Sequence, residues 1–365
     1  MNRLQTIGLA VLALLVGWLG GCEDRSSPTA PPELLPPAAS ARPTPTPAPD
    51  ELTLVFPYGS EKKAWLEEVA AAFNAEARRT AAGRRIRVEP RAMGSGDSIT
   101  QIAEGHLQAH LVSPASGAFI ELGNAASRAA TGGPLVGPTE NLVLSPVVIA
   151  MWRPMAEALG WPEKPLGWAD VAALAQDDRG WAAYGYPQWG RFRFGHTHPE
   201  YSNSGLISLI ATVYAGAGKQ RGLTLEDVAR PEVAQFLEGV EMAVVHYGES
   251  TGFFGQKLFS NGPEYLSAAV LYENMVIESY DAGTYSLPFP VVAVYPKEGT
   301  FWSDHPVGVV EREWVTAEHR EAAGAYIEFL LDEPQQRRAM ERGFRPGDPS
   351  IALASPLDAS HGIDP

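Results

Sequence analysis

The sequence predicts an α/β fold, because three consecutive units each contain an apolar strand, a turn of small polar residues and a helix. The strands span residues 52–56, 85–89 and 110–113, and the turns span 57–60, 91–98 and 114–117. Such a series predicts parallel strands whose carboxyl ends share one edge of a sheet. Ligands of parallel α/β sheets bind at that edge, so these turns are candidate binding segments.

Composition sets the scale of the protein and excludes one class of partner. A chain of 365 residues is long enough for about two domains. It carries 28 basic and 43 acidic residues, a formal net charge of -15, and no cluster of Lys and Arg. This charge has the wrong sign for neutralising phosphates, so we expect no nucleic-acid partner. A small anion is still possible, since local N–H dipoles can outweigh a global field.

The amino terminus predicts export. Arg3 precedes an apolar span, residues 7–19, which is the layout of a secretion signal and is short for a transmembrane helix. The following Leu19-Gly20-Gly21-Cys22 resembles the bacterial lipobox, in which the cysteine is lipidated and becomes the first residue of the mature chain. We therefore predict a lipoprotein signal peptide at 1–21 and lipidation, such as palmitoylation, at Cys22. Cys22 is the only cysteine, which excludes an intramolecular disulfide.

Residues 22–50 are rich in Pro, Ala, Ser and Thr. Such a segment cannot pack a core and is predicted to be an extended tether between membrane and folded chain. The protein is thus expected outside the cytoplasm, in the periplasm or at the cell surface, held to the membrane through Cys22.

The first helix follows the first turn. Its apolar residues recur with helical spacing from 61 to 74, so Ser60 is predicted to cap it. Lys62 and Lys63 are predicted on its solvent face. The second turn, Gly94-Ser95-Gly96, precedes a helix expected at 99–107, but it matches neither a Walker nor a dinucleotide pattern.

Later segments predict a second unit. A long apolar strand at 141–151 is interrupted by Ser145-Pro146 and is long enough to run from one domain into another. Helices are predicted at 153–159, 168–175, 206–214 and 231–246, a strand at 290–296 and a last helix at 320–331. Within this unit, Ser202-Asn203-Ser204-Gly205 precedes an apolar run and has the residue types that cap a helix. The free N–H groups of such a helix start can bind an anion or a carboxylate.

In this order the parts resemble a bacterial extracellular solute-binding protein of the two-lobed type II class, near the sulfate and molybdate branch. The matching parts are the lipobox, the strand before Ser60, the strand around Ser145-Pro146, the helix start at 168–171, the stretch 198–205, Tyr272-Glu273-Asn274, the stretch 294–299 and the end of the last helix near 343–346. The resemblance implies hinge-linked lobes with mainly parallel sheets. It places lobe I at 51–145 plus 290–346, lobe II at 146–289 and a tail at 347–365.

The resemblance also implies capture of a small ligand between the lobes and its delivery to an ABC-type membrane permease. An oxyanion, a small carboxylate or another organic solute is expected, with no cofactor and a monomeric protein. Oxyanion-binding relatives hold the ligand with Ser hydroxyls, backbone N–H groups and a Tyr, without counter-cations. The corresponding candidates here are Ser60, Ser95, Gly96, Ser113, Ser145, Ser202, Asn203, Ser204, Tyr272 and Glu273.

Two acidic residues depart from this pattern. Asp97 and Glu273 fall near the expected site, where a carboxylate beside a dianion is unfavourable unless it is protonated or bridged by a cation. Either the ligand carries a cationic or amino group, or these two side chains point elsewhere.

An enzyme is the alternative, either a metal-dependent or a serine-dependent secreted lipoprotein hydrolase. His196, His198 and Glu200 are metal-ligand types, but their spacing in a loop fits no compact zinc motif, so no metal is expected. Ser250 lies in a Gly-x-Ser-x-Gly pattern, which requires a preceding strand. The residues before it predict a helix instead, so we expect this match to be accidental.

Overall fold

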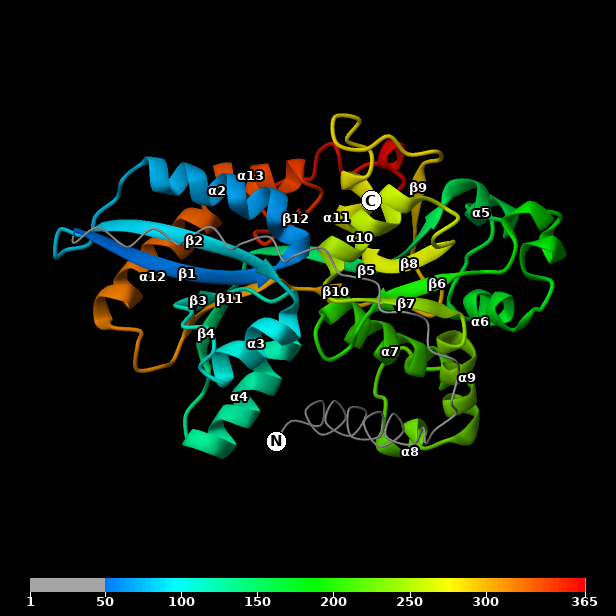
Figure 1. Ribbon diagram of the computed structural model, residues 1–365, viewed down its shortest axis with the longest axis horizontal. Helices are drawn as coiled ribbons and strands as arrows, with labels where there is room; N and C mark the ends of the chain where they lie inside the picture. The colour runs from blue at the N-terminus through cyan, green and yellow to red at the C-terminus, as the bar shows by residue number, and fades with distance from the viewer. Residues whose placement is uncertain (1–49, 365) are drawn as a thin grey trace, which may run out of the picture.

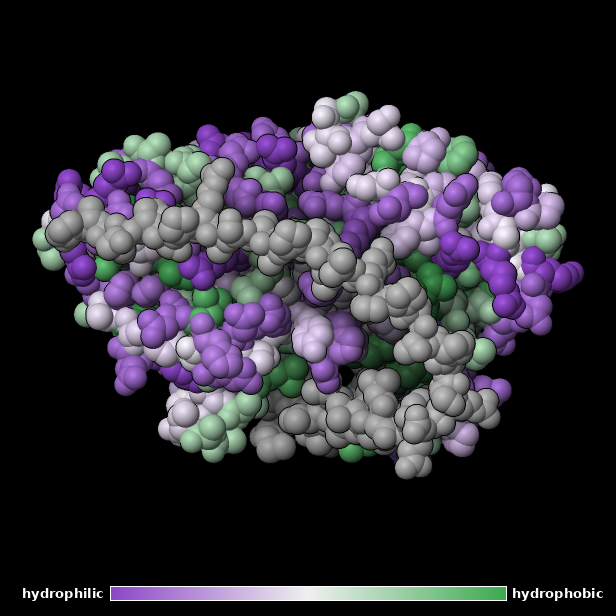
Figure 2. Space-filling view, in the orientation of Figure 1, coloured by the Kyte–Doolittle hydropathy of each residue, from purple (hydrophilic) through white to green (hydrophobic). Residues whose placement is uncertain are grey.

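The computed structural model describes residues 50–364 as two α/β lobes that lie side by side along the long axis of the molecule (Figure 1). The predicted signal peptide, lipidation site and most of the tether lie outside the described residues. Among the described residues, no helix is long and apolar enough to cross a membrane. On the face in Figure 2, hydrophilic residues cover much of the outer surface of both lobes.

The first lobe contains two small sheets and the helices that cover them. Helices α2, α12 and α13 pack together near β1 and β2, while α3 and α4 pack on each other beside the second sheet. Its elements are β1 (Glu51–Gly59), η1 (Ser60–Lys62), α2 (Lys63–Ala75), β2 (Arg85–Met93), α3 (Ser95–Ala103), β3 (Leu111–Val112), α4 (Gly117–Thr131), β4 (Val136–Asn141), β11 (Pro306–Val310), α12 (Ala317–Leu331), α13 (Glu333–Glu341) and β12 (Arg345–Pro346).

The second lobe is built on one larger sheet, with α10 and α11 above it and α7 and α9 below it in Figure 1. Its elements are β5 (Val143–Trp152), α5 (Arg153–Ala158), α6 (Trp168–Gln176), η2 (Gly180–Tyr184), η3 (Pro187–Trp189), β6 (Phe194–Thr197), α7 (Asn203–Gly216), α8 (Leu225–Val228), α9 (Pro231–Glu241), β7 (Val244–Gly248), α10 (Thr251–Asn261), β8 (Ala268–Tyr272), α11 (Glu273–Glu278), β9 (Val291–Val294) and β10 (Trp302–Ser303). A last 3-10 turn, η4 (Ala359–His361), lies in the tail.

The sheets are mixed rather than mainly parallel. β1 pairs with β2, and β6 pairs with β7 and β8, in parallel. Antiparallel pairs surround β5, which contacts β8, β9, β10 and β12, and β11, which contacts β3 and β4. These antiparallel partners arise because the chain crosses between the lobes and enters each sheet in the opposite direction.

The crossing segments form the hinge. β5 pairs with β12 at its start and with β8 and β9 further along, so it runs from one lobe into the other. The chain returns through β10, which pairs with Ser145 and Pro146, and enters the first lobe at β11. The tail then crosses once more, since the Gly362 carbonyl accepts a hydrogen bond of 2.8 Å from the Ala293 N–H. The predicted boundaries, 51–145 with 290–346 and 146–289, stay a prediction.

Separate cores stabilise the two lobes. Buried side chains from β1, α2, α12 and their neighbours form one cluster, and α3, α4 and β11 enclose a second. The largest cluster lies around β5, β8 and β9 in the second lobe. The cores are not fully independent, because Leu206 of α7 is buried among first-lobe residues of the second cluster, so apolar as well as polar contacts hold the lobes together in this state.

Several local predictions were wrong. Ser60 does not cap the first helix, because it is the first residue of η1 and α2 begins only at Lys63, without a side-chain cap. The helix predicted at 99–107 is α3, which begins earlier, at Ser95, and ends at Ala103.

Lys62 is fully buried rather than on a solvent face, because η1 turns it inward before α2 begins. The helix predicted at 231–246 ends at Glu241, and Val244–Gly248 forms β7 because it pairs with β6.

Candidate functional site

The beginnings of η1 and α10 meet between the lobes. The Ser60 Oγ donates a hydrogen bond of 2.8 Å to the Ser250 Oγ and accepts one of 2.9 Å from the Gly252 N–H. Ser60 and Ser250 are both buried. Two serines 190 positions apart in the sequence therefore connect the lobes directly.

The beginnings of α3 and α7 meet in the same way. The Gly96 N–H donates to the Tyr201 carbonyl at 2.9 Å, and the Asp97 N–H donates to the same oxygen at 3.3 Å. A Cβ on Gly96 would lie 1.8 Å from the Glu200 carbonyl oxygen, and one on Gly94 would lie 2.3 Å from that of Tyr201. Only glycine permits this approach of the two backbones, so the described state is a closed one.

Side chains at the start of α7 contact other elements of the second lobe. The Asn203 Nδ2 donates to the Tyr272 hydroxyl at 3.0 Å and to the Ser303 Oγ at 3.1 Å. The hydroxyls of Ser202 and Ser204 contact Thr251 at 3.1 and 2.9 Å. The Asn203 Oδ1 is buried without a hydrogen-bond partner, so its acceptor is left free.

The end of β3 contributes from the first lobe. The Ser113 carbonyl accepts from the Gly59 N–H at 3.0 Å, which places Ser113 beside Ser60, and its buried Oγ has no partner. The nearby Ser95 Oγ accepts from the Ala115 N–H at 2.9 Å. Buried polar atoms without partners are uncommon, and a bound ligand or water is one way to satisfy them.

We call this region the polar junction. Its members are Ser60, Ser95, Gly96, Ser113, Ser202, Asn203, Ser204, Ser250, Thr251, Tyr272 and Ser303. The starts of α3, α7 and α10 contribute N–H groups, and the remaining groups are neutral hydroxyls and an amide. Such donors suit an anion, because the positive ends of the helix dipoles lie at these starts.

Two predicted site residues face the hinge instead. The Glu273 carboxylate is fully buried, accepts two hydrogen bonds of 2.9 Å from the Arg345 guanidinium and is also bonded by the Tyr295 hydroxyl. The Ser145 Oγ accepts from the Asn274 N–H at 3.3 Å. The predicted conflict between Glu273 and an anion is therefore removed by Arg345, whereas Asp97 stays between the lobes, where its N–H contacts the Tyr201 carbonyl.

A buried charged cluster lies next to the junction. The Lys62 Nζ is 2.8 Å from the Glu61 Oε1 and 3.2 Å from the His305 Nδ1, and the His305 ring lies edge-on to that of Tyr272. Burial opposes ionisation of Glu61, but Lys62 and His305 together lower its pKa to about 2. Burial, assisted by Lys62, lowers the pKa of His305 to about 4. The cluster therefore holds an ion pair and a neutral imidazole.

A hollow of about 450 Å³ opens beside the junction, and we call it the mouth hollow. The first lobe contributes Met93, Gly94 and Asp97 to its wall, and the second contributes Tyr201, Glu249 and Phe253. Ser250 also lines it, and the same serine contacts Ser60 inside the junction. The mouth hollow and the polar junction thus share a wall.

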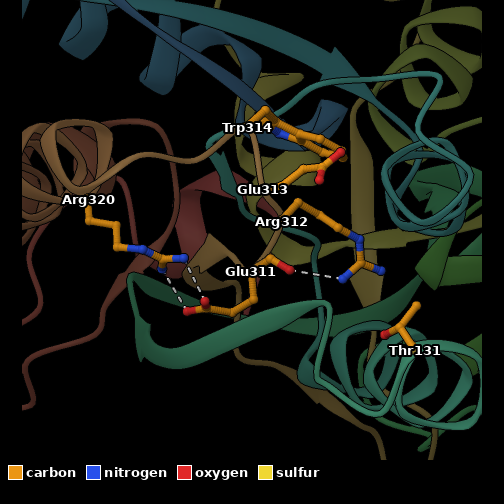
Figure 3. A pocket seen from close by; sticks show the side chains of 6 residues that line it. All are labelled: Thr131, Glu311, Arg312, Glu313, Trp314 and Arg320. Carbon is orange, nitrogen blue, oxygen red and sulfur yellow. Dashed lines mark hydrogen bonds and ion pairs between the residues drawn. The ribbon is translucent and has the colours of Figure 1, made fainter.

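A second hollow lies on the first lobe between α4, β11 and α12, and Figure 3 shows its side chains. Arg320 makes two hydrogen bonds, of 2.8 and 2.7 Å, to the Glu311 carboxylate. Arg312 donates to the Pro134 and Glu311 carbonyls and to the Ser127 hydroxyl. The two arginines of this hollow are already bonded by the protein itself, so we do not assign it a ligand.

The side chains considered for a metal diverge. The His196 Nε2 lies 3.0 Å from the Glu241 carboxylate, whereas His198 stacks on Tyr201 and its Nδ1 accepts from the Glu200 N–H at 3.4 Å. Within residues 50–364, no group of three or more His, Cys, Asp or Glu side chains is arranged to hold a metal ion.

Ser250 has the backbone context that the sequence did not predict. β7 precedes it and α10 follows it, as a nucleophile elbow requires. The Ser250 hydroxyl accepts a hydrogen bond from Ser60 rather than contacting a histidine that could act as a base. The local geometry therefore matches an elbow without supplying a nucleophile–base pair.

Comparison with known proteins connects this geometry to a family. The family described as bacterial extracellular solute-binding protein matches residues 54–345. The chain belongs to this family. Its members are binding proteins that act outside the cytoplasm, and this solute-binding protein shares their two-lobed α/β fold.

Solved structures agree on the fold. The sulfate-binding protein SubI from Mycobacterium tuberculosis is 21% identical, with a TM-score of 0.53 over 82% of this chain and 88% of that one. A periplasmic thiamin-binding protein is 12% identical, with a TM-score of 0.58 over 85% and 88%. AfuA from Actinobacillus pleuropneumoniae, bound to fructose-6-phosphate, is 14% identical, with a TM-score of 0.56 over 83% and 88%. No curated protein matches significantly.

Sequence reasoning identified most of the polar junction but missed several of its members. Thr251 contacts both Ser202 and Ser204, Ser303 contacts Asn203, and Ser250 contacts Ser60. The small polar residues around 250 were a usable signal for Ser250 and Thr251, since they resemble the other helix starts. Ser303 has no comparable local signal.

Proposed function

We propose that this protein is a membrane-anchored extracytoplasmic binding protein that captures a small oxyanion or carboxylate in the polar junction and delivers it to an ABC-type permease. The observation that carries the proposal is the meeting of three helix starts, those of α3, α7 and α10, around buried hydroxyl and amide groups. Neutral hydroxyl and amide donors near the positive ends of helix dipoles bind an anion without requiring a counter-cation.

The unpartnered atoms support this assignment. The buried Ser113 hydroxyl of the first lobe has no partner and can donate to an anion, whereas the buried Asn203 Oδ1 of the second lobe can only accept, so it suits an N–H or O–H group of the ligand. A ligand that contacts both residues favours closure, because it binds the closed arrangement better than an open one. The membership in the solute-binding family supports the same use of the cleft.

A thermal-shift screen of the purified protein tests the proposal, using sulfate, molybdate, tungstate, phosphate and small carboxylates. An anion at about a hundred times its Kd stabilises the native state by about 2.7 kcal/mol, which raises the Tm by several degrees. Calorimetry with the anion that produces the shift should then show about tenfold weaker binding for Ser113→Ala, since a hydrogen bond to a charged group contributes about 1.5–3 kcal/mol, and a smaller loss for Asn203→Ala, which removes a neutral acceptor.

Ser208→Ala is the matched control. Ser208 lies in α7 and has a buried, unpartnered hydroxyl like that of Ser113, but it was not among the residues of the polar junction. Its variant should keep the affinity of the wild type. If no anion shifts the Tm, or if all three variants bind equally well, the proposal is wrong.

Anchoring has its own test. The proposal assigns lipidation to Cys22, so Cys22→Ser should move the protein from the membrane fraction to the soluble extracytoplasmic fraction. A variant that stays with the membrane would contradict the anchor but would leave the assignment of the polar junction intact.

A further inference from the structure

The mouth hollow differs chemically from the polar junction beside it. Its wall contains a carboxylate from each lobe, Asp97 and Glu249, and two aromatic rings, Tyr201 and Phe253. No Lys or Arg is among the residues that line it. A site for a simple anion would be weakened by these carboxylates, since each repels a negative ligand nearby.

We propose that the mouth hollow holds a cationic organic group of the ligand, so that the ligand is a zwitterion with an oxyanion at one end and an ammonium group at the other. This inference rests on the proposed function, because it assigns the oxyanion to the polar junction. The two regions share Ser250, so one molecule can contact both.

The size of the mouth hollow agrees with an organic group. Its volume of about 450 Å³ falls within the range of organic ligand sites, about 300–1,000 Å³, and far exceeds an inorganic oxyanion. An oxyanion bound in the junction would leave this hollow filled with water alone. A ligand with an organic extension fills both regions.

The walls have the chemistry that recognises an ammonium group. Tyr201 is 49% exposed and Phe253 is 39% exposed, so both keep aromatic surface accessible in the closed state. Ammonium groups bind over aromatic faces, and the Lys63 Nζ already lies 5.9 Å from the centre of the Phe253 ring. Lys63 is thus a cation of the protein itself that competes with a ligand for the Phe253 ring. One Asp97 oxygen accepts from Gln101 at 2.8 Å, which orients the carboxylate without neutralising it.

The arrangement also links the cation to closure. Asp97 belongs to the first lobe, whereas Glu249, Tyr201 and Phe253 belong to the second. The two carboxylates repel each other as the lobes approach, and a cation between them removes that repulsion. An ammonium group therefore favours the closed state.

Matched pairs of probes test the inference by calorimetry. The pairs are 2-aminoethylphosphonate with ethylphosphonate, and taurine with ethanesulfonate, so that each pair differs in the amino group. We expect the wild type to bind the amino member of at least one pair about tenfold more tightly. In Asp97→Asn/Glu249→Gln this preference should fall to within about twofold, while the protein keeps its Tm.

Glu163→Gln/Glu226→Gln is the control, because it makes the same change in net charge at exposed positions away from the hollow. It should keep the preference of the wild type. The inference is overturned if inorganic oxyanions bind but neither pair shows a preference, or if the preference survives in Asp97→Asn/Glu249→Gln. Failure of every inorganic and organic anion to bind would instead overturn the proposed function.

Discussion

At the scale of single residues, the most unusual group is the buried cluster of Glu61, Lys62 and His305. All three side chains are almost fully buried, and the His305 Nε2 has no hydrogen-bond partner. His305 faces Glu61 and Lys62 from η1, its neighbour Asp304, and the rings of Tyr272 and Phe344. Such a cluster costs free energy to bury unless its charges stay paired, so its protonation should affect stability.

We expect acid to weaken the fold through His305. Its pKa is lowered from 6.5 to about 4, so between these values the unfolded chain takes up a proton that the folded protein rejects. Stability is therefore lost as the pH falls through this window. Glu61 acts in a lower pH window, because the stability that comes from its lowered pKa is lost only below pH 4.5. Urea unfolding should show a loss between pH 7 and pH 4.5 that is about 2 kcal/mol smaller in His305→Gln than in the wild type.

His106→Gln is the control for this measurement, because the His106 side chain is 72% exposed. It should lose as much stability as the wild type on acidification. His110 also has a pKa lowered to about 4, by burial and by His319, so some acid sensitivity remains in His305→Gln. Equal losses in His305→Gln and the wild type would show that His305 does not titrate as described.

At the scale of elements, glycines at helix starts decide how closely the lobes approach. A Cβ at Gly96, the second residue of α3, would lie 1.8 Å from the Glu200 carbonyl, and one at Gly252 in α10 would lie 2.4 Å from the Ser60 carbonyl. In both cases the clash is with backbone of the other lobe. These starts therefore function as contact points for closure as well as donors to the junction.

Gly96→Ala should prevent closure. The added methyl group meets a backbone carbonyl rather than a flexible side chain. We therefore expect anion binding to weaken at least about tenfold, which corresponds to a free-energy penalty of about 1.4 kcal/mol for reaching the closed state. Small-angle scattering should show a larger radius of gyration than that of the wild type in the presence of the anion.

Gly324→Ala is the matched control, since nothing lies within 4 Å of a Cβ at this position in α12. It should bind normally and gain up to about 1 kcal/mol of stability through helix propensity. Normal binding by Gly96→Ala would mean that the lobes tolerate a wider closed state.

The start of α11 depends on a partner in β12. Arg345 makes both of its 2.9 Å bonds to Glu273, whose side chain is 0% exposed. Arg345→Met leaves this buried carboxylate without its cation, so we expect a loss of about 3–5 kcal/mol in the free energy of urea unfolding.

Arg342→Met breaks the comparable pair with Glu68, in which both side chains are more than 40% exposed. The expected loss there is below about 1 kcal/mol. Similar losses in the two variants would contradict the assignment of Glu273 and Arg345 as a hinge pair.

At the scale of the whole molecule, the two lobes are connected by the crossing segments, the polar junction and the apolar contact of Leu206 with the first lobe. β5, the β10–β11 segment and the tail cross between the lobes. The direct bonds from Ser60 to Ser250 and Gly252 add contacts that exist only when the lobes are closed. Opening requires these bonds to break while the hinge strands stay paired.

A disulfide across this contact should lock the protein shut. The Ser60 and Ser250 Oγ atoms are 2.8 Å apart, so we expect Ser60→Cys/Ser250→Cys, made in a Cys22→Ser background, to form a disulfide on oxidation. In stopped-flow experiments the oxidised form should bind the anion more slowly by at least about tenfold, because entry requires opening. The reduced form of the same protein is the control, and equal rates in both forms would indicate that entry needs no opening.

The sequence alone determined the features that depend on neighbouring residues. The α/β class follows from alternating strands, small polar turns and helices, and the structure has that class. The positions of the small polar turns follow from local sequence, although Ser60 and Ser95 are the first residues of η1 and α3 rather than caps, and the Ser202 side chain makes no capping bond. The family resemblance supplied the two lobes, because a series of weak motifs in order carries more information than any one of them.

Only the tertiary structure decided which side chains face each other, because those partners are distant in the sequence. β7 forms a strand since β6 lies beside it, although its residues also suit a helix. Glu273 turns to Arg345, 72 positions away, and Ser204 turns to Thr251, 47 positions away, so neither contact leaves a local pattern. The site therefore combines helix starts that local sequence specifies with pairings that long-range packing alone selects.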